Sequence, residues 1–269
     1  MRRKEKFYLK GNESDIKDVM ITIFPDSLSP ELGIIENIYT DTPEYLRLIN
    51  ECKNRNIDLF FRSFEMEYTK SDLERAEYFV LNVNSYCSEF SDEYDTEYSY
   101  DNKCSCCGSG RTQISDLYID KSKMGKKEIS VTYDLVWVIS DKIYRLFIEN
   151  GITGVEFGNV HHKKNGKIKS EPLLYQLKSS NTLPPLNEKS VFFKEKFCEC
   201  CKKSGLFLHS LPYYNMENLK NAKDVNYTYE YFGAGFSGRP YIIVSKKVYK
   251  LLKANKIKGV KFDIVNILK

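Results

Sequence analysis

Six of the eight cysteines in this 269-residue chain lie in two short clusters with the same spacing. The first cluster is Cys104-Ser105-Cys106-Cys107, and the second is Cys198-Glu199-Cys200-Cys201. Each cluster contains a Cys-x-x-Cys pair, in which two intervening residues let a tight turn direct both sulfurs at one ion. Two such pairs supply the four ligands of a tetrahedral zinc site. The spacing therefore predicts a structural zinc ion, Zn²⁺, held by Cys104, Cys107, Cys198 and Cys201.

The remaining cysteines have other expected roles. Cys106 and Cys200 occupy the middle positions of the two clusters and are competing ligands. Cys52 and Cys87 lie elsewhere, and we expect them to be ordinary buried thiols. A redox Cys-x-x-Cys motif needs a preceding strand and a helix that opens on it, whereas the residues on both sides of the first pair are typical of loops. The metal interpretation is therefore favoured over the redox one.

An internal duplication is the second sequence feature that limits the possible folds. Ten positions are identical when the window 135–160 is aligned with 240–265, at an offset of 105 residues. Chance would give roughly one or two identities at average composition. Each copy has the pattern of a buried strand, a serine N-cap (Ser140 or Ser245), an amphipathic helix and a second strand of the form Gly-Val-x-Phe. The duplicated unit is therefore a strand–helix–strand module.

The duplication extends back to the cysteine pairs. Residues 127–134 match 223–230 at an offset of 96, and the cysteine clusters match at an offset of 94. We expect an α+β fold in which tandem duplicated strand–helix–strand modules are joined by a four-cysteine zinc knuckle pair, with an N-terminal α+β segment. This organisation predicts three parts: the N-terminal segment at 1–103, a first module at 104–180, and a linker with the second module at 181–269.

The second copy holds an insertion near Phe232–Pro240, because the offset rises by nine residues there. The insertion contains Gly233-Ala234-Gly235-Phe236-Ser237-Gly238-Arg239, which formally matches the G-x-G-x-x-G fingerprint of dinucleotide sites. That fingerprint must open a helix whose N-terminus holds the pyrophosphate, but here a proline and a predicted strand follow. We therefore predict a glycine-rich loop, and its functional interpretation is contact with a partner through Phe236 and Arg239.

Local signals in the N-terminal segment predict several elements. Apolar runs at Phe7–Leu9, Met20–Phe24 and Tyr78–Val83 indicate strands. Thr42 is expected to cap a helix that has Pro43 at its first position.

Charge is distributed unevenly, although 41 basic and 37 acidic residues leave a net charge of only +4. Residues 65–101 carry a net charge of −9, and residues 189–269 carry +10. An acidic stretch interleaved with tyrosines can dock a basic partner through steering charge and aromatic anchors; the simpler interpretation is a solvated loop. The candidate partner-binding residues in this stretch are Glu89, Asp92, Glu93, Tyr94, Asp95, Glu97 and Tyr98.

Composition and motifs limit the class of function. The hydrophobic share of 42% fits a folded chain, and the near balance of charge argues against a dedicated nucleic-acid binder. The sequence contains no Walker loop, HExxH motif or marked nucleophile–base pair, so we expect a protein that is not an enzyme. It shows no secretory signal and no apolar run of membrane-spanning length. We therefore expect a cytoplasmic protein with reduced thiols and no membrane partner.

The order of these features resembles the bacterial double-CXXCG motif family. The matching segments are Cys104–Gly108, Ile139–Phe157, Leu173–Leu177, Cys198–Cys201, Asp224–Tyr227 and Val244–Phe262. Lys202 stands where the family has the glycine that follows the second pair. The strand–helix–strand half also looks like related immunity-protein families of polymorphic toxin systems.

This resemblance implies a cytoplasmic immunity protein, similar to an antitoxin, that binds a cognate toxin protein and neutralises it by stoichiometric occlusion. The metal ligands of the family correspond to Cys104, Cys107, Cys198 and Cys201. An alternative remains open, because paired knuckles and a basic C-terminal region are also typical of a zinc-ribbon nucleic-acid-binding protein.

Overall fold

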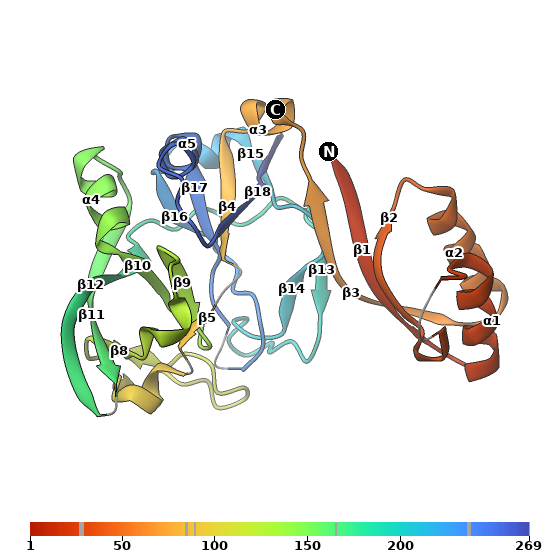
Figure 1. Ribbon diagram of the computed structural model, residues 1–269, viewed down its shortest axis with the longest axis horizontal. Helices are drawn as coiled ribbons and strands as arrows, with labels where there is room; N and C mark the ends of the chain where they lie inside the picture. The colour runs from red at the N-terminus through yellow and green to blue at the C-terminus, as the bar shows by residue number, and fades with distance from the viewer. Residues whose placement is uncertain (27–29, 84–85, 89, 165, 236–237, 269) are drawn as a thin grey trace. The chain divides into compact units, whose positions relative to one another are not determined.

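The computed structural model has an α+β fold and describes all of the chain except residues 27–29, 84–85, 89, 165, 236–237 and 269 (Figure 1). The chain forms two compact units, Met1–Arg75 and Ala76–Lys269. Each unit has its own sheets and its own buried core.

The first unit contains a three-stranded antiparallel sheet of order β2-β1-β3 and two longer helices that share its core. Its elements are β1 (Arg2–Lys10), α1 (Glu13–Ile23), a 3-10 helix (Pro30–Leu32), β2 (Ile34–Tyr39), α2 (Pro43–Asn54), β3 (Asp58–Glu67) and α3 (Lys70–Arg75). The predicted strand at Phe7–Leu9 is part of β1. The predicted cap of α2 is also present, because Thr42 accepts a hydrogen bond from the Tyr45 amide at 3.4 Å.

One expectation for this unit is wrong, because the predicted strand at Met20–Phe24 is the end of helix α1. The helix begins after Asn12, whose side chain accepts hydrogen bonds from the amides of Ser14 and Asp15. It then buries a stripe of residues at helical spacing: Ile16, Val19, Met20 and Ile23. Burial of that stripe outweighs the β-propensity of the run Ile21-Thr22-Ile23.

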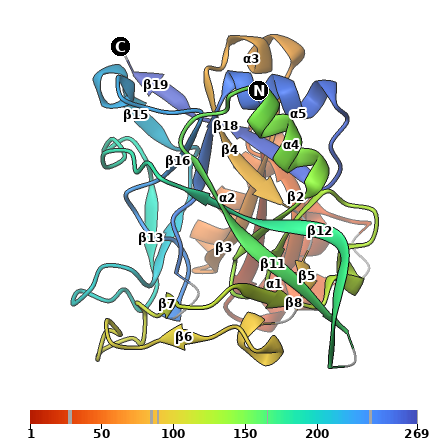
Figure 2. The same ribbon diagram turned by 90° about the vertical axis from the view of Figure 1, so that its left-hand side faces the viewer.

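The second unit is built around two sheets, of which the first has six strands in the order β5-β9-β10-β12-β11-β8. Its strands, and the helix that packs on them, are β5 (Tyr86–Ser88), β8 (Leu117–Ile119), β9 (Ile129–Thr132), β10 (Trp137–Ser140), α4 (Asp141–Glu149), β11 (Val155–Lys164) and β12 (Lys167–Ser179). The long β11–β12 hairpin is drawn in green in Figure 2.

The second sheet has four strands in the order β16-β17-β4-β18. Its strands and its helix are β4 (Tyr78–Val83), β16 (Val225–Tyr227), β17 (Ile242–Ser245), α5 (Lys246–Ala254) and β18 (Val260–Ile264). In Figure 1 the orange β4 lies between the blue strands β17 and β18, although it is far from both in the sequence.

Short strand pairs and 3-10 helices complete the second unit. The pairs are β6 (Tyr98–Ser99) with β7 (Thr112–Gln113), β13 (Phe192–Lys194) with β14 (Leu206–Leu208), and β15 (Tyr213–Asn215) with β19 (Asn266–Leu268). The 3-10 helices are Ser91–Tyr94, Lys121–Met124 and Met216–Leu219. The first cysteine cluster lies between β6 and β7 and the second between β13 and β14, so both are in the turns of short antiparallel pairs.

The duplicated modules have the same side-chain packing. Each sheet holds one aromatic triad; the triads are Tyr144, Phe157 and Tyr175 in the first sheet, and Tyr249, Phe262 and Phe79 in the second. The helix tyrosine of each triad stacks on the ring of the central strand, with centroids 4.0 Å apart in the first sheet and 4.3 Å in the second. It also meets a phenylalanine edge-on, at 4.8 Å and 5.0 Å.

Strands β12 and β4 occupy the same place in the two sheets. β12 lies between β10 and β11 with Tyr175 opposite Ile139, and β4 lies between β17 and β18 with Phe79 opposite Val244. The unit therefore contains two full repeats, a first repeat (residues 78–164) that begins with β4 and a second repeat (residues 167–264) that begins with β12. Each repeat inserts its first strand into the sheet of the other.

Contacts between the repeats are also reciprocal. Gly154 of the first repeat packs against the carbonyl of Val225, and Gly259 of the second repeat packs against the carbonyl of Ile129. Both glycines have positive φ, 75° and 97°, and a Cβ atom at either position would collide with that carbonyl. Mutual contacts of this kind are those of a two-fold symmetric pair. The two repeats are therefore related by an approximate two-fold axis.

The second unit begins at Ala76, whereas the sequence analysis expects the N-terminal segment to extend to residue 103. The exchange of strands accounts for this difference. β4 pairs with the second sheet, and β5 pairs in parallel with β9 of the first sheet. The predicted strand at Tyr78–Val83 matches β4, but its partners lie near the end of the chain. Local sequence signals find such a strand and cannot reveal its partners.

Candidate metal centre

The four paired cysteines lie in two turns with equivalent main-chain hydrogen bonds. The Gly108 amide donates to the Cys104 carbonyl at 2.9 Å, and the Lys202 amide donates to the Cys198 carbonyl at 2.8 Å. Gly108 and Lys202 both have positive φ, 78° and 57°. Glycine adopts this conformation without strain, which accounts for the glycine after the first pair. Lys202 adopts it at an energetic penalty of about 1–2 kcal/mol.

These turns bring the four sulfurs into one cluster. Cys104 Sγ lies 3.7 Å from Cys198 Sγ, and Cys107 Sγ lies 3.5 Å from Cys201 Sγ. All four sulfurs lie within 4.8 Å of one another. Tetrahedral zinc with Zn–S bonds of about 2.3 Å separates its sulfurs by about 3.8 Å, so the cluster has the dimensions of a metal site. Each cysteine faces its own counterpart, which places the cluster on the approximate two-fold axis.

Three of the four cysteines have shifted pKa values. A hydrogen bond from Ser109 lowers the pKa of Cys107 to about 6, and the main-chain amides of Cys107 and Cys106 lower the pKa of Cys104. Burial raises the pKa of Cys201 to about 12. Metal ligands must be thiolates, so a metal ion that binds at neutral pH displaces a proton from Cys201. Cys107 therefore loses its proton more readily than Cys201.

Cys106 and Cys200 form a disulfide with each other, whereas the sequence predicts them as competing metal ligands. Both occupy exposed middle positions of their turns and meet across the axis as the other cysteine counterparts do. Their sulfurs form a second close group with Cys198, but a metal ligand must be a thiolate and a disulfide sulfur is not one. With this disulfide formed, the four paired cysteines are the set that can hold an ion.

The two isolated cysteines are buried, as the sequence predicts. Cys52 is 1% exposed and Cys87 is 0% exposed. Burial raises the pKa of Cys52 to about 11 and that of Cys87 to about 12. Both thiols are therefore protonated at neutral pH and are poor nucleophiles or ligands.

A buried ionic network follows the first cysteine turn, and sequence reasoning missed it. Arg111 Nη2 donates to Asp134 Oδ2 at 2.7 Å, and Asp134 is fully buried. Ser91 and Tyr98 donate to the same carboxylate at 2.8 Å and 2.9 Å. Burial acts to raise the pKa of Asp134, but hydrogen bonds from Thr132 and these groups, with the charge of Arg111, outweigh it and lower the pKa. These partners are scattered along the chain, so no local motif marks them.

The predicted acidic surface is only partly a free surface. Four of its carboxylates are exposed: Asp92, Glu93, Asp95 and Glu97. Asp92 binds Arg111 Nη1 at 3.2 Å, and Asp95 is paired with Lys163. The strongest candidates for contact with a partner are therefore Glu93 and Glu97, with Asp95 beside them.

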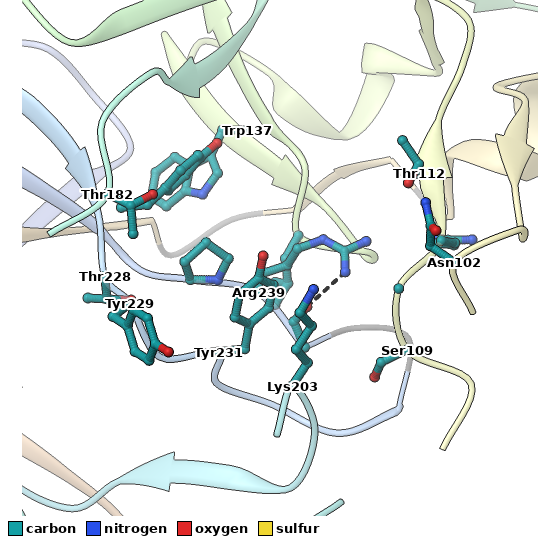
Figure 3. A pocket seen from close by; sticks show the side chains of 16 residues that line it. Asn102, Ser109, Thr112, Trp137, Thr182, Lys203, Thr228, Tyr229, Tyr231 and Arg239 are labelled. Carbon is teal, nitrogen blue, oxygen red and sulfur yellow. Dashed lines mark hydrogen bonds between the residues drawn. The ribbon is translucent and has the colours of Figure 1, made fainter. Parts of the chain in front are cut away.

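Of the other predicted partner-binding residues, Tyr98 and Arg239 line one cavity of the second unit. Tyr94 is half-buried, and the hydroxyl of Tyr98 is bonded to the buried Asp134. Arg239 lines a cavity together with Trp137 (Figure 3). Glu89 and Phe236 lie outside the described residues.

Two comparisons with known proteins found no match. The chain matches no model of a protein family, and a search among curated proteins finds no significant match. Over the residues that the structure describes, no helix combines the length and the apolar character needed to cross a membrane. The assignment of function therefore rests on the metal centre and on the surfaces beside it.

Proposed function

We propose that the four-cysteine cluster holds a structural zinc ion, and that the chain is a cytoplasmic immunity-type protein that neutralises a cognate toxin protein by stoichiometric occlusion. Four cysteine ligands leave no open coordination position, which is typical of structural zinc and not of catalytic zinc. The ion lies where the two repeats meet, so its role is to fix them in one orientation. The disulfide between Cys106 and Cys200 keeps these two cysteines from competing with the four ligands for the metal.

The observation that carries the binding role is an acidic loop with a firmly held backbone. Ser91 and Thr96 in this loop are 0% and 4% exposed. Ser91 donates to Asp134, and Thr96 Oγ1 accepts a hydrogen bond from the Tyr118 amide at 2.9 Å. The exposed carboxylates of Glu93, Asp95 and Glu97 are presented from this anchored backbone. A loop ordered before association loses little conformational entropy when a partner binds.

An acidic loop of this kind fits a basic partner. Complementary charge accelerates encounter and selects among partners. A toxin that acts on an anionic substrate carries a basic face, and a protein that covers this face blocks the toxin without any chemistry of its own. This is the mechanism that the resemblance to immunity proteins implies.

The basic residues around the second cysteine pair support the nucleic-acid alternative less well. Exposed lysines lie on both sides of this pair: Lys194, Lys196, Lys202 and Lys203. They alternate with Glu195 and Glu199, and Lys194 lies 3.7 Å from the carboxylate of Glu199. Such a mixed surface gives a weaker phosphate-binding field than a continuous basic one. A protein partner is therefore the better assignment.

Co-expression with the product of the neighbouring gene tests this function. We expect the two proteins to co-purify in equal amounts, and the chain to restore growth that the neighbouring product inhibits. The triple variant Glu93→Gln, Asp95→Asn, Glu97→Gln should associate more slowly and protect less well, because it removes the steering charge.

A matched control removes three exposed carboxylates elsewhere in the second unit: Glu149→Gln, Glu188→Gln, Glu217→Gln. The control should protect as well as the original chain. Equal loss in both triple variants would rule out the acidic loop as the binding surface. If the neighbouring product is harmless and no protein co-purifies, the immunity function is refuted.

A further inference from the structure

The second unit contains a cavity of about 480 Å³ that both repeats line. This size is within the range of small-molecule sites, about 300–1,000 Å³. The first repeat contributes Arg111 and Trp137, and the second contributes Lys203, Tyr227 and Arg239. Figure 3 shows Arg239 and Lys203 extending into the same part of the cavity, with the indole ring of Trp137 to one side.

The lining of this cavity has one sign of charge. Among the described lining residues, three are cationic (Arg111, Lys203 and Arg239) and none is acidic. An adjoining cavity of about 320 Å³ shares Arg111, Trp137 and Arg239, adds Lys178, and again has no carboxylate among its described lining residues. A concave surface lined by cations concentrates anions, because low-dielectric walls focus the field. Arg239 and Lys203 supply most of this field, since Asp92 and Asp134 offset the charge of Arg111.

The two guanidinium groups are held in place by the surrounding protein. Arg111 is bound to Asp134 and lies over the ring of Tyr98, 4.0 Å from its centroid. Arg239 Nη1 donates to the Gly238 carbonyl at 2.8 Å. Burial and the nearby charge of Arg111 lower the pKa of Arg239. A bound anion would offset the repulsion at Arg239 and favour its charged form.

The cationic and aromatic lining arises where the two repeats differ. The nine residues present only in the second repeat, 231–239, supply Tyr231, Gly238 and Arg239 to the cavity. Lys203 is an extra residue of the second cysteine turn, because the carbonyls that accept from the Cys104 and Cys198 amides are those of Ser109 and Ser204. The side chain of Lys203 lines the cavity. The cavity is thus built by the part of the second repeat that departs from the common pattern.

We propose that this cavity binds a small ligand that combines a phosphate group with a planar aromatic ring, in the manner of a nucleoside monophosphate. The phosphate group binds Arg239, whose planar guanidinium group forms paired hydrogen bonds to phosphate oxygens. Arg111 is itself bound to Asp92 and Asp134 and lines the same wall. Lys203 adds a third cation at the same end. The ring stacks on Trp137, since base–aromatic stacking tolerates any base.

Trp137 makes the proposal directly testable, because it is the single tryptophan of the chain. Titration of the full chain with AMP should change the tryptophan fluorescence in a saturable way. Inorganic phosphate and adenosine, titrated separately, should each bind more weakly than AMP by about tenfold or more. The variant Arg239→Gln should weaken AMP binding by about tenfold or more, since it removes a charge-assisted contact.

A matched pair of lysine variants distinguishes a specific contribution of the cavity from a general effect of positive charge. Lys203→Gln should weaken AMP binding by about threefold, while Lys202→Gln, at the exposed neighbouring position outside the cavity, should leave it unchanged. Circular dichroism of each variant establishes that it is folded. A fluorescence signal that does not respond to millimolar AMP would overturn the proposal, and so would a folded Arg239→Gln variant with unchanged affinity. Equal affinity for phosphate and AMP would contradict the proposed stacking of the ring on Trp137. Tighter binding of a long single-stranded oligonucleotide than of AMP would contradict the assignment of a mononucleotide as the ligand.

Discussion

The two repeats of the second unit agree in their sheets and differ in their loops. Their aromatic triads, strand registers and close-packed glycines correspond residue by residue. The loops after the cysteine pairs do not: in the second repeat Lys203 is added before Ser204, the counterpart of Ser109, Glu230 replaces Asp134, and nine further residues are added. The shared part builds the fold and the four-cysteine cluster on the two-fold axis. The differing part builds the cationic cavity.

The corresponding acids Asp134 and Glu230 show this difference most clearly. Asp134 is fully buried, is bound by Arg111, and has a lowered pKa. Glu230 accepts a hydrogen bond from the Leu186 amide at 2.8 Å, while its Oε2 atom accepts none from the described residues. Burial raises the pKa of Glu230. The first repeat therefore holds a stabilised carboxylate where the second holds a destabilised one.

The largest predicted effect concerns the exchanged strands. Phe79 on β4 is 0% exposed, so Phe79→Ala should lower the free energy of unfolding of the second unit by about 3–5 kcal/mol. Its counterpart Tyr175 on β12 is only half-buried, so Tyr175→Ala should have less than half of that effect. Urea unfolding followed by circular dichroism measures both. Equal losses in the free energy of unfolding would contradict the predicted difference between the buried Phe79 and the half-buried Tyr175.

The next effect concerns the network around Asp134. The variant Asp134→Asn leaves Arg111 without its buried carboxylate and should lower the free energy of unfolding at neutral pH by about 3 kcal/mol. A carboxyl group with a lowered pKa in the folded state stabilises above its ordinary pKa, and this stabilisation is lost as the pH falls. The difference between the original chain and the variant should therefore shrink below pH 3.8, the ordinary aspartate value. A difference that is independent of pH would contradict the ionised state of Asp134.

The smallest effect has the opposite sign and concerns Glu230. A carboxyl group with a raised pKa binds its proton more tightly in the folded state, so stability falls as the pH rises above its ordinary pKa of 4.5. Glu230→Gln keeps an oxygen for the Leu186 amide and has no such titration. The variant should be slightly more stable than the original chain at neutral pH, with no gain below pH 4.5. Thermal melts across this pH range measure the difference, and a less stable variant at neutral pH would contradict the prediction.

The sequence predicted the parts of this molecule that depend on local or repeated patterns. Cysteine spacing indicated the four sulfurs that meet, and the helix cap at Thr42 was visible from its neighbours. The exchange of β4 and β12 was not predictable, because the pairing of strands that are distant in the sequence depends on the tertiary arrangement of the whole unit. Arg111 and Asp134 likewise meet only after folding. The disulfide between Cys106 and Cys200 depends on the two-fold arrangement, which the repeat alone did not reveal.

The metal content of the purified chain tests the central claim, that a zinc ion on the approximate two-fold axis joins the two repeats. Elemental analysis of protein prepared under reducing conditions should give about one zinc ion per chain. Cys104→Ser and Cys198→Ser, one in each repeat, should both lose it, whereas Cys106→Ser should retain it. A folded original chain without zinc, or full zinc content in either ligand variant, would contradict the claim.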